Sequence, residues 1–363
     1  MNQYEVIGIM SGSSMDGVDI AHCVFTNNNN QWSYKITHAV TVPYEEKWRV
    51  RLSQLRKQES LIYVKTDVYY AHYLSELVLD FIQTNNLKPQ LIASHGHTIF
   101  HFPQNRITAQ VGDGATLAAL TGIPVVSDLR SADVALGGQG APLVAMGDQM
   151  LFAEYDYFLN LGGFSNISGP NMQGDYVAFD VGPCNIPLNR IAREQGKAYD
   201  EMGVIAASGS IDYGLLNNLN QIPYYSKSYP KSLNRDWINK NFWPIVRESE
   251  QTWENKMRTI VDHIAQQVGL AISNLCVDNG TGKKVMVTGG SAYNPILLDH
   301  IQTHSDAEII VPQPQLIDYK EAMVFGFLGL LRVLNINNTL ATATGASQSV
   351  ISGTLSGNFS HLL

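Results

Sequence analysis

Apolar positions in this chain form short runs of strand character at first and stretches of helical spacing later. Tyr4–Met10 and Asp19–Phe25 are short apolar runs on either side of the polar, glycine-containing segment Ser11–Val18, so they predict a hairpin. Ser33–Val42 extends this hairpin to three strands. Leu61–Ile82 carries apolar residues at helical spacing and predicts a long helix.

The strand–glycine turn–strand pattern recurs in the second half of the chain. Tyr157–Leu161 and Phe164–Ser168 flank Gly162-Gly163, and Tyr176–Phe179 is a third strand. This is a weak repeat of architecture rather than of sequence. The other predicted elements are strands at Leu91–Ser94, Ile107–Gly112, Val125–Ser127, Lys284–Val287 and Glu308–Val311, and helices at Asp113–Leu120, Ile186–Glu194, Ile211–Asn218, Trp253–Val277, Pro295–Thr303 and Glu321–Leu334. Together they predict a mixed α/β protein with glycine turns at strand ends.

The length of 363 residues exceeds what one compact core usually holds, so two domains are expected. The glycine-rich segment Leu136–Pro142 is the candidate junction. We therefore expect an N-terminal lobe over residues 1–135, joined by the C-terminal segment 345–363, and a second lobe over 136–344.

Composition narrows the class of protein. Apolar residues make up 45% and charged residues 15%, which fits a globular protein with a sizeable core. The net charge of −8 argues against nucleic acid as the main partner. The sequence shows neither a signal peptide nor a membrane span, and its three cysteines are far apart, so we expect a soluble protein of the cytoplasm.

Three glycine turns follow apolar strands: Gly12 to Gly17, Gly162-Gly163 and Gly289-Gly290. Tight turns expose backbone N–H groups, which can hold phosphate without hindrance from side chains. None of the turns matches the Walker or the Rossmann glycine pattern. The alternative is that they are ordinary hairpin and helix-entry glycines.

The first turn also carries hydroxyls and two carboxylates. Ser11, Ser13 and Ser14 are candidate partners for phosphate oxygens. A carboxylate beside phosphate would be repelled unless a cation intervened, so Asp16 or Asp19 points to Mg²⁺, held through water. The alternative for Asp16 is a turn-forming residue before glycine.

Asp180 follows the apolar strand that ends at Phe179, where a general base would sit in an α/β enzyme. The alternative is that Asp180 caps the next helix. Pro183 weakens this alternative, because Asn185 lies closer to the helix start.

Taken together, the motifs GIMSGSSMDGVD (8–19), NLGGFSNIS (160–168), FDVGPCN (179–185) and VTGGSAYNP (287–295) resemble the anhydro-N-acetylmuramic acid kinase family. The resemblance covers nearly the whole chain. It implies a two-lobed actin/hexokinase-like (ribonuclease H-like) α/β fold, in which each lobe is a mixed sheet flanked by helices. It also implies ATP and Mg²⁺, a small anhydro amino sugar as substrate, and a homodimer.

The reaction implied by the family phosphorylates the 6-oxygen of 1,6-anhydro-N-acetylmuramic acid while water opens the anhydro bridge, in cell-wall sugar recycling. Asp180 corresponds to the family's base. The implied nucleotide contacts are Gly12, Ser13, Ser14, Met15, Asp16, Gly17, Val18, Asp19, Gly162, Gly163, Asn166, Gly289, Gly290 and Asn294, with Asp16 and Asp19 toward Mg²⁺. The implied sugar contacts are His97, Gln110, Arg130 and Glu321, and the forked cation of Arg130 suits a lactyl carboxylate.

Some features leave room for other interpretations. His95, His97 and His101 have a spacing that zinc could use, but no nearby carboxylate or cysteine completes such a site. Val181 and Cys184 stand where the family usually has Thr and Gly, which affects fine geometry near the base. The rival functions are a sugar kinase without ring opening and an actin- or Hsp70-like ATP switch.

Overall fold

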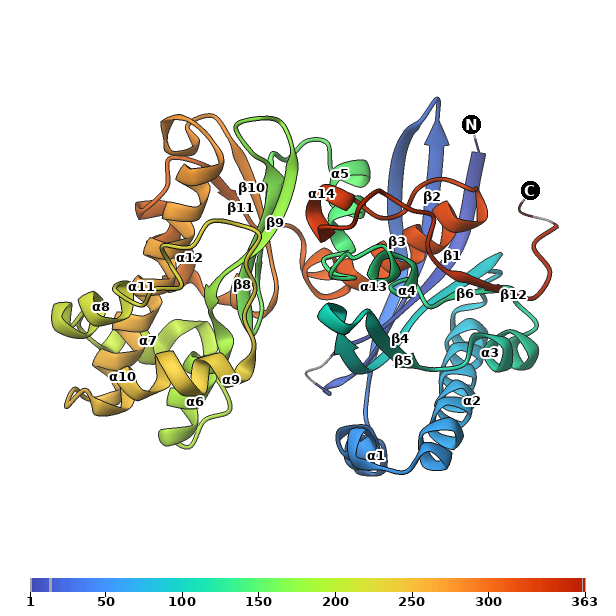
Figure 1. Ribbon diagram of the computed structural model, residues 1–363, viewed down its shortest axis with the longest axis horizontal. Helices are drawn as coiled ribbons and strands as arrows, with labels where there is room; N and C mark the ends of the chain where they lie inside the picture. The colour runs from blue at the N-terminus through green and yellow to red at the C-terminus, as the bar shows by residue number, and fades with distance from the viewer. Residues whose placement is uncertain (1, 13–14, 361, 363) are drawn as a thin grey trace. The chain divides into compact units, whose positions relative to one another are not determined.

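The computed structural model describes residues 2–12, 15–360 and 362. It contains two compact units, Met1–Phe152 with Tyr319–Leu363 (unit 1) and Ala153–Asp318 (unit 2) (Figure 1). These bounds differ from the expected lobes 1–135 with 345–363 and 136–344. The reason is that the glycine-rich segment after residue 135 folds into unit 1. The Asp133 carboxylate accepts hydrogen bonds from the Gly140 N–H and the Thr344 hydroxyl, each at 2.7 Å.

Unit 1 is built on a seven-stranded mixed sheet with the order β12-β6-β4-β1-β2-β3, and β5 pairs with β4. Strands β1 to β3 form antiparallel pairs, whereas β4 pairs parallel with both β1 and β6. The strands are β1 (Asn2–Ser11), β2 (Gly17–Asn28), β3 (Gln31–Pro43), β4 (Leu91–Phe102), β5 (Ile107–Val111), β6 (Val125–Ser127) and β12 (Thr354–Ser356).

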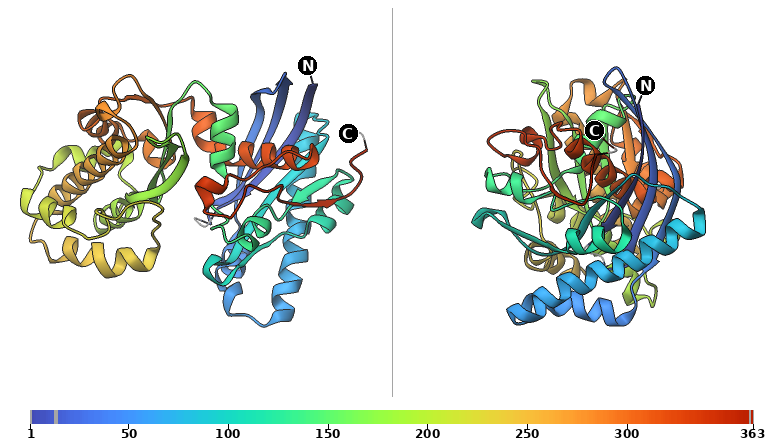
Figure 2. Two further views of the ribbon diagram at one scale, coloured as in Figure 1. Left: turned by 45° about the horizontal axis from the view of Figure 1, so that its top comes forward. Right: turned by 90° about the vertical axis from the view of Figure 1, so that its right-hand side faces the viewer.

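Helices flank the sheet of unit 1. Ile7, Ile9 and Ile92 pack in one buried cluster with Tyr70 and Leu74 of α2 (Ser60–Asn85), which Figure 2 shows as a long light-blue helix. The part of α13 (Pro314–Val333) from Tyr319 onward also belongs to this unit. The other helices of unit 1 are α1 (Glu46–Gln54), α3 (Gly114–Thr121), α4 (Ser131–Ala135), α5 (Val144–Leu151) and α14 (Ala341–Thr344).

Glycine lets α13 approach β1 closely. A Cβ added at Gly8 would lie 1.8 Å from the backbone oxygen of Ala322, so no larger residue fits without moving the helix. Gly8 is therefore a packing residue within a strand. It is not part of the turn in the opening motif, which comes after β1 ends at Ser11.

The sheet of unit 2 repeats the topology of five strands of unit 1, β6-β4-β1-β2-β3. It has the order β11-β10-β7-β8-β9, with antiparallel pairs β7/β8 and β8/β9 and parallel pairs β10/β7 and β10/β11. The weak repeat expected from the strand–glycine turn–strand pattern is thus confirmed. The strands are β7 (Tyr157–Leu161), β8 (Phe164–Pro170), β9 (Tyr176–Pro183), β10 (Lys284–Thr288) and β11 (Glu308–Ile310).

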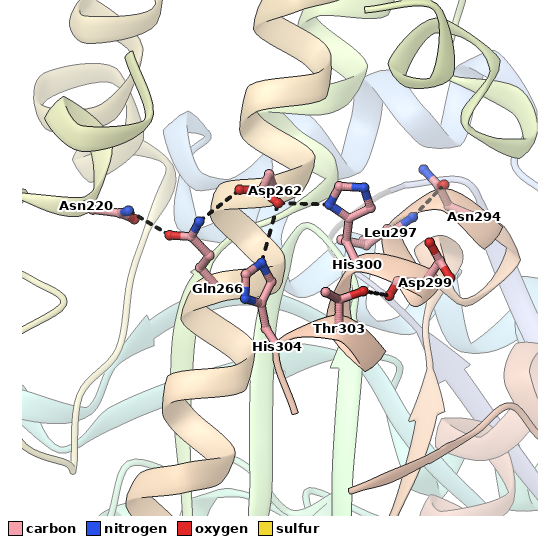
Figure 3. A network of polar contacts seen from close by, with 9 residues as sticks. All are labelled: Asn220, Asp262, Gln266, Asn294, Leu297, Asp299, His300, Thr303 and His304. Atoms are coloured by element: carbon pink, nitrogen blue, oxygen red, sulfur yellow. Dashed lines mark hydrogen bonds and ion pairs between the residues drawn. The ribbon is translucent and has the colours of Figure 1, made fainter. Parts of the chain in front are cut away.

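The helices of unit 2 are α6 (Asn185–Glu194), α7 (Val204–Ser208), α8 (Tyr213–Asn220), α9 (Arg235–Trp237), α10 (Trp243–Glu248), α11 (Trp253–Leu275) and α12 (Pro295–Thr303). A buried carboxylate links α11 to α12 (Figure 3). Asp262 Oδ1 lies 2.9 Å from His300 Nδ1 and 3.4 Å from His304 Nε2, and Asp262 Oδ2 accepts a hydrogen bond from Gln266.

Several strands are longer than their apolar runs predict, and two of these extensions bear on the site. The strand predicted at Leu91–Ser94 continues through His95 and His97 to Phe102, so these histidines lie in β4 and not in a loop. The strand predicted at Tyr176–Phe179 continues to Pro183, so Asp180 lies inside β9. Polar residues continue a strand when its backbone remains paired, which the apolar pattern does not reveal.

The expected fold class is confirmed: the chain is an α/β protein of two units, each a mixed sheet flanked by helices. Among the helices of the described residues, none has the length and apolarity needed to cross a membrane.

Candidate active site

Asp180 is held by a segment that is distant in sequence. Its carboxylate Oδ2 accepts a hydrogen bond of 2.8 Å from the Leu233 N–H. Its own N–H donates to the Lys231 carbonyl at 3.1 Å, and its carbonyl accepts from the Tyr224 hydroxyl at 2.7 Å. Asp180 is not a helix cap, since the N-cap position of α6 is Cys184. These contacts position the Asp180 side chain. The hydrogen bond from Leu233 uses only Oδ2, so Oδ1 takes no part in it.

Burial raises the pKa of Asp180 to about 6, while the Leu233 N–H opposes this rise. At neutral pH the carboxylate is therefore ionised, yet it is more basic than an exposed aspartate. This is the electrostatic state that a general base requires.

Polar side chains extend across the sheet from Asp180. The strand register places Asn166 of β8 opposite Asp180, and Asn160 of β7 opposite Asn166. Opposed residues of neighbouring strands project from the same face of a sheet. The register shifts between Ser165 and Asn166, so β9 carries an extra residue next to Asp180, and such bulges re-aim side chains beside active sites.

Asn185 connects the two glycine turns of unit 2. Its N–H donates to the Gly162 carbonyl at 3.0 Å, and its Nδ2 donates to the Leu161 carbonyl at 3.0 Å. Its Oδ1 accepts from the Ser291 hydroxyl, next to Gly290. The turns Gly162-Gly163 and Gly289-Gly290 are therefore neighbours, as a shared phosphate site would require.

Gly289 has the backbone conformation that only glycine adopts readily, with φ of +88°. A Cβ there would also lie 2.4 Å from Asn160 Oδ1 and 2.7 Å from the Leu161 carbonyl carbon. Gly289 thus packs too closely against the other turn to carry a side chain, so its backbone groups are the contacts that it can offer.

Asn294 caps the N-terminus of a helix. It is the N-cap of α12, and its Oδ1 accepts a hydrogen bond of 3.1 Å from the Leu297 N–H (Figure 3). The residue is buried. The cap uses one lone pair of its side-chain oxygen and leaves its Nδ2 group as a possible donor to a ligand.

The opening motif of unit 1 forms a turn tied to Tyr44. The Met15 N–H donates to the Gly12 carbonyl at 3.3 Å, and the Asp16 carbonyl accepts from the Tyr44 N–H at 3.2 Å. Asp16 is exposed. Ser13 and Ser14 lie outside the described residues.

The last three residues of the predicted phosphate turn belong to β2. Gly17 opens this strand, Val18 is fully buried in the core, and the Asp19 carboxylate accepts a hydrogen bond of 2.6 Å from the Thr41 hydroxyl. The Val18 side chain therefore packs in the core of unit 1, directly after the turn. Among the described residues, no group of three His, Cys, Asp or Glu side chains is arranged to hold a metal.

His97 lies in a chain of buried hydroxyls. The Ser11 hydroxyl is 2.7 Å from His97 Nδ1 and 2.5 Å from the Tyr44 hydroxyl, which in turn contacts the Tyr70 hydroxyl. Burial lowers the pKa of His97 to about 4, so the ring is neutral at physiological pH. The histidine fixes the end of β1, directly before the opening turn.

Arg130 is bound by His95 and by the glycine-rich segment. Its Nε donates to His95 Nε2 at 2.8 Å, and its Nη1 donates to the Gly140 carbonyl. Burial lowers the pKa of Arg130 to about 10, against the attraction of Glu321 and Asp133. The guanidinium remains charged at neutral pH. Glu321 itself is an exposed residue of α13.

Gln110 lines a polar pocket of about 350 Å³ in unit 1 together with His95, Asp67 and Asp128. Its amide donates to the Thr108 hydroxyl at 2.8 Å. His97, Arg130 and Glu321 are not among the lining residues, so the pocket contains one of the four predicted sugar contacts. Arg130 does not line the pocket, but it donates a hydrogen bond to His95, which does.

Sequence reasoning missed three residues that organise the site: His95, Asn185 and Leu233. Asn185 stands inside the motif FDVGPCN, and His95 belongs to the histidine-rich stretch with His97 and His101, so a signal for both existed. Leu233 acts through its backbone N–H, which any residue except proline supplies, so its sequence carries no signal.

Replacing Asp180 by Asn is expected to stabilise the protein at pH 8. A carboxylate whose pKa is higher in the folded than in the unfolded state contributes stability below about pH 4 and loses it as pH rises through 6. The neutral amide avoids this loss, so the free energy of unfolding should rise by about 1–2 kcal/mol at pH 8 and be unchanged near pH 4. Urea unfolding at both pH values measures this, with exposed Asp175→Asn as the control. A variant no more stable than wild type at pH 8 would refute the raised pKa.

Comparison with known proteins identifies the family. Residues 4–357 match the family described as Anhydro-N-acetylmuramic acid kinase. Relatives of that name include proteins of Methylorubrum populi (31% identical, covering 98% of this chain and 100% of the relative), Vibrio cholerae (32%, 94% and 95%) and Shewanella loihica (33%, 99% and 100%). Among solved structures, a xylulose kinase from Lactobacillus acidophilus is similar with a TM-score of 0.47 at 11% identity, over 99% of this chain and 96% of that one. The chain belongs to the anhydro-N-acetylmuramic acid kinase family and is an ATP-dependent sugar kinase.

Proposed function

We propose that this kinase opens 1,6-anhydro-N-acetylmuramic acid with water and phosphorylates its 6-oxygen, giving N-acetylmuramic acid 6-phosphate and ADP. The observation that carries the proposal is Asp180, a half-buried carboxylate held by the Leu233 N–H and kept basic by its surroundings. Membership of the family supports the choice of substrate. A role in cell-wall sugar recycling follows from that substrate.

Asp180 is the proposed general base. It takes a proton from water, and the water oxygen bonds to C1 of the sugar while the C1–O6 bond breaks. O6 then bonds to the γ-phosphorus, and the bond from that phosphorus to the β-phosphate oxygen breaks to release ADP. Because phosphoryl transfer depends mainly on positioning and charge neutralisation, the remaining residues serve chiefly to bind.

For the nucleotide, the proposed contacts come from the opening turn and from the glycine turns that Asn185 connects. They are Gly12, Ser13, Ser14, Met15, Asp16, Gly17, Val18, Asp19, Gly162, Gly163, Asn166, Gly289, Gly290 and Asn294. Backbone N–H groups of tight turns suit phosphate oxygens. Asp16 and Asp19 are the candidates for contacts to Mg²⁺ through water, which would neutralise phosphate charge. The exposure of Asp16 favours it, since Asp19 is engaged with Thr41.

For the sugar, the proposed contacts are His97, Gln110, Arg130 and Glu321. Arg130 has a half-buried, charged guanidinium that suits the lactyl carboxylate. We also propose that the enzyme works as a homodimer in the cytoplasm, where ATP is supplied.

The rate of turnover should fall on the acid side of pH 6. Asp180 must be ionised to accept a proton, and burial raises its pKa to about 6. Below that pH, kcat should therefore fall about tenfold for each further unit, whereas it should be level between pH 7 and 8. A pH–rate profile at saturating substrates measures this. An acid limb near pH 4 would mean that an ordinary exposed carboxylate is responsible.

The direct test compares substrates. Purified protein with ATP and Mg²⁺ is offered anhydro-N-acetylmuramic acid, N-acetylmuramic acid or glucose, and ADP release is followed. The proposal expects turnover of the anhydro sugar. Turnover of glucose alone would favour a sugar kinase without ring opening, and ADP release independent of sugar would favour an ATP switch.

A further inference from the structure

A second pocket, of about 320 Å³, lies wholly within unit 2. Phe179 and Val181 of β9 line it, and both pack in the buried core cluster. Asp180 is not among its lining residues, and the alternation of side chains in a strand turns Asp180 away from Phe179. The pocket is therefore separate from the residues proposed for the reaction.

Lys231 gives this pocket its charge. It is the only charged residue among those that line it. Its ammonium lies 4.9 Å from the centre of the Tyr224 ring and 5.7 Å from that of Phe179. In the part of the chain that the structure describes, Lys231 takes part in no ion pair. A half-buried cation without a carboxylate partner favours an anion from solution.

The other walls are partly apolar and partly fixed by hydrogen bonds. Ala271 and Leu270 of α11 continue the apolar surface, and Leu270 is 56% exposed at its edge. On the polar side, Asn220 Oδ1 accepts from Gln267 Nε2 at 3.0 Å, and Asn220 Nδ2 donates to Gln266, which binds Asp262 (Figure 3). This wall is thus already arranged before any ligand arrives.

From this geometry we propose that the pocket binds a small organic anion: a carboxylate or phosphate group on Lys231, attached to an apolar or aromatic body that lies against Phe179 and Leu270. The volume admits a molecule about the size of one substituted ring. The negative charge of such a molecule complements Lys231, and its apolar body complements Phe179 and Leu270.

The segment 224–233 connects this pocket to Asp180. Tyr225, Ser226 and Lys231 from this segment line the pocket. The same segment supplies all three contacts described for Asp180: the Tyr224 hydroxyl, the Lys231 carbonyl and the Leu233 N–H. A ligand that holds Lys231 therefore also holds the donor that stabilises the ionised carboxylate. This part of the inference rests on the proposed role of Asp180 as the base.

Binding is tested by thermal unfolding with phenyl phosphate, phenylacetate and neutral benzyl alcohol, with a non-hydrolysable ATP analogue present to fill the nucleotide site. At ten times Kd, an anion should raise Tm of the wild type by about 3 °C, and the alcohol should not. Comparing the two anions tells whether phosphate or carboxylate is preferred. Lys231→Met should abolish the shift, and the control Lys227→Met, an exposed lysine outside the pocket, should keep it.

Leu270→Trp provides a second variant should Lys231→Met fold poorly, because an indole at this exposed edge would fill the pocket and block the anion. Equal shifts in wild type and in both variants, or no shift with either anion, would overturn the site. In the wild type, the anion should also move the acid limb of kcat to lower pH. A limb that stays or moves upward would overturn the coupling to Asp180, while the binding result would stand independently of the proposed function.

Discussion

Asp180→Asn is expected to lower kcat by about 10³-fold or more while leaving nucleotide affinity within about threefold of wild type. The amide cannot accept the proton of the attacking water. It can still accept the Leu233 N–H hydrogen bond that positions the side chain, so the surrounding segment should not move. None of the proposed phosphate contacts changes. Steady-state kinetics together with calorimetric titration of an ATP analogue measures both halves.

The control for this variant is Asp175→Asn, an aspartate exposed in the connection between β8 and β9. It makes the same chemical change outside the site and should retain full turnover. If Asp180→Asn retained turnover within about tenfold of wild type, another group would have to be the base. If nucleotide affinity fell together with kcat, Asp180 would be acting on binding and not only on chemistry.

Gly8→Ala is expected to lower the free energy of unfolding by about 3 kcal/mol or more, which corresponds to a Tm lower by roughly 6–12 °C. The added methyl group would overlap the Ala322 backbone oxygen, at 1.8 Å, and Gly326 N, at 2.9 Å. Both neighbours are backbone atoms of α13, so relief requires moving the helix from the sheet. Differential scanning calorimetry of unit 1 unfolding measures the effect.

Gly214→Ala is the matched control, because Gly214 lies inside α8 and the nearest atom to its added methyl group is a side-chain oxygen at 3.3 Å. Alanine favours helix over glycine, so this variant should be neutral or more stable by up to about 1 kcal/mol. A Gly8→Ala protein with the Tm of the control would mean that α13 does not approach β1 as closely as described.

The two-unit α/β fold could be predicted because apolar periodicity marks regular elements directly. Tyr157–Leu161 and Pro295–Thr303 were placed at their observed bounds, and Leu61–Ile82 lies within α2. Helices with weaker patterns, such as Glu46–Gln54 and Val144–Leu151, were not predicted. A short helix spans too few turns for a periodic pattern to stand out, so tertiary packing decides whether it forms.

The boundary between the units could not be predicted from glycine content. Glycine shows where a chain can turn, not which unit it joins. Here the Asp133 carboxylate binds both Gly140, which is close in sequence, and Thr344, which lies 211 residues after Asp133. These hydrogen bonds keep the glycine-rich segment in unit 1. Such long-range pairing leaves no local pattern.

The candidate active site could likewise be predicted only in part. Asp180 was a prediction from its place after an apolar strand, and the resemblance to a family gave it a role. Its partners were out of reach, because Leu233 contributes only a backbone N–H, and Asn185 and Ser291 meet only when α6 and β10 are folded. His95 has a spacing that zinc could use but no further ligand nearby in the sequence, and in the fold it binds Arg130. Residue types near a site are visible in sequence, but their pairing is not.

Opening of the anhydro ring by water during phosphate transfer distinguishes the proposed reaction from that of a simple sugar kinase. Mass spectrometry of the sugar product, formed from anhydro-N-acetylmuramic acid and ATP, decides between them. Because water adds to C1 as the bridge opens, the product should be heavier than the substrate by one phosphoryl group and one water molecule. A product heavier by the phosphoryl group alone would contradict the proposed reaction, since the anhydro bridge would then be intact.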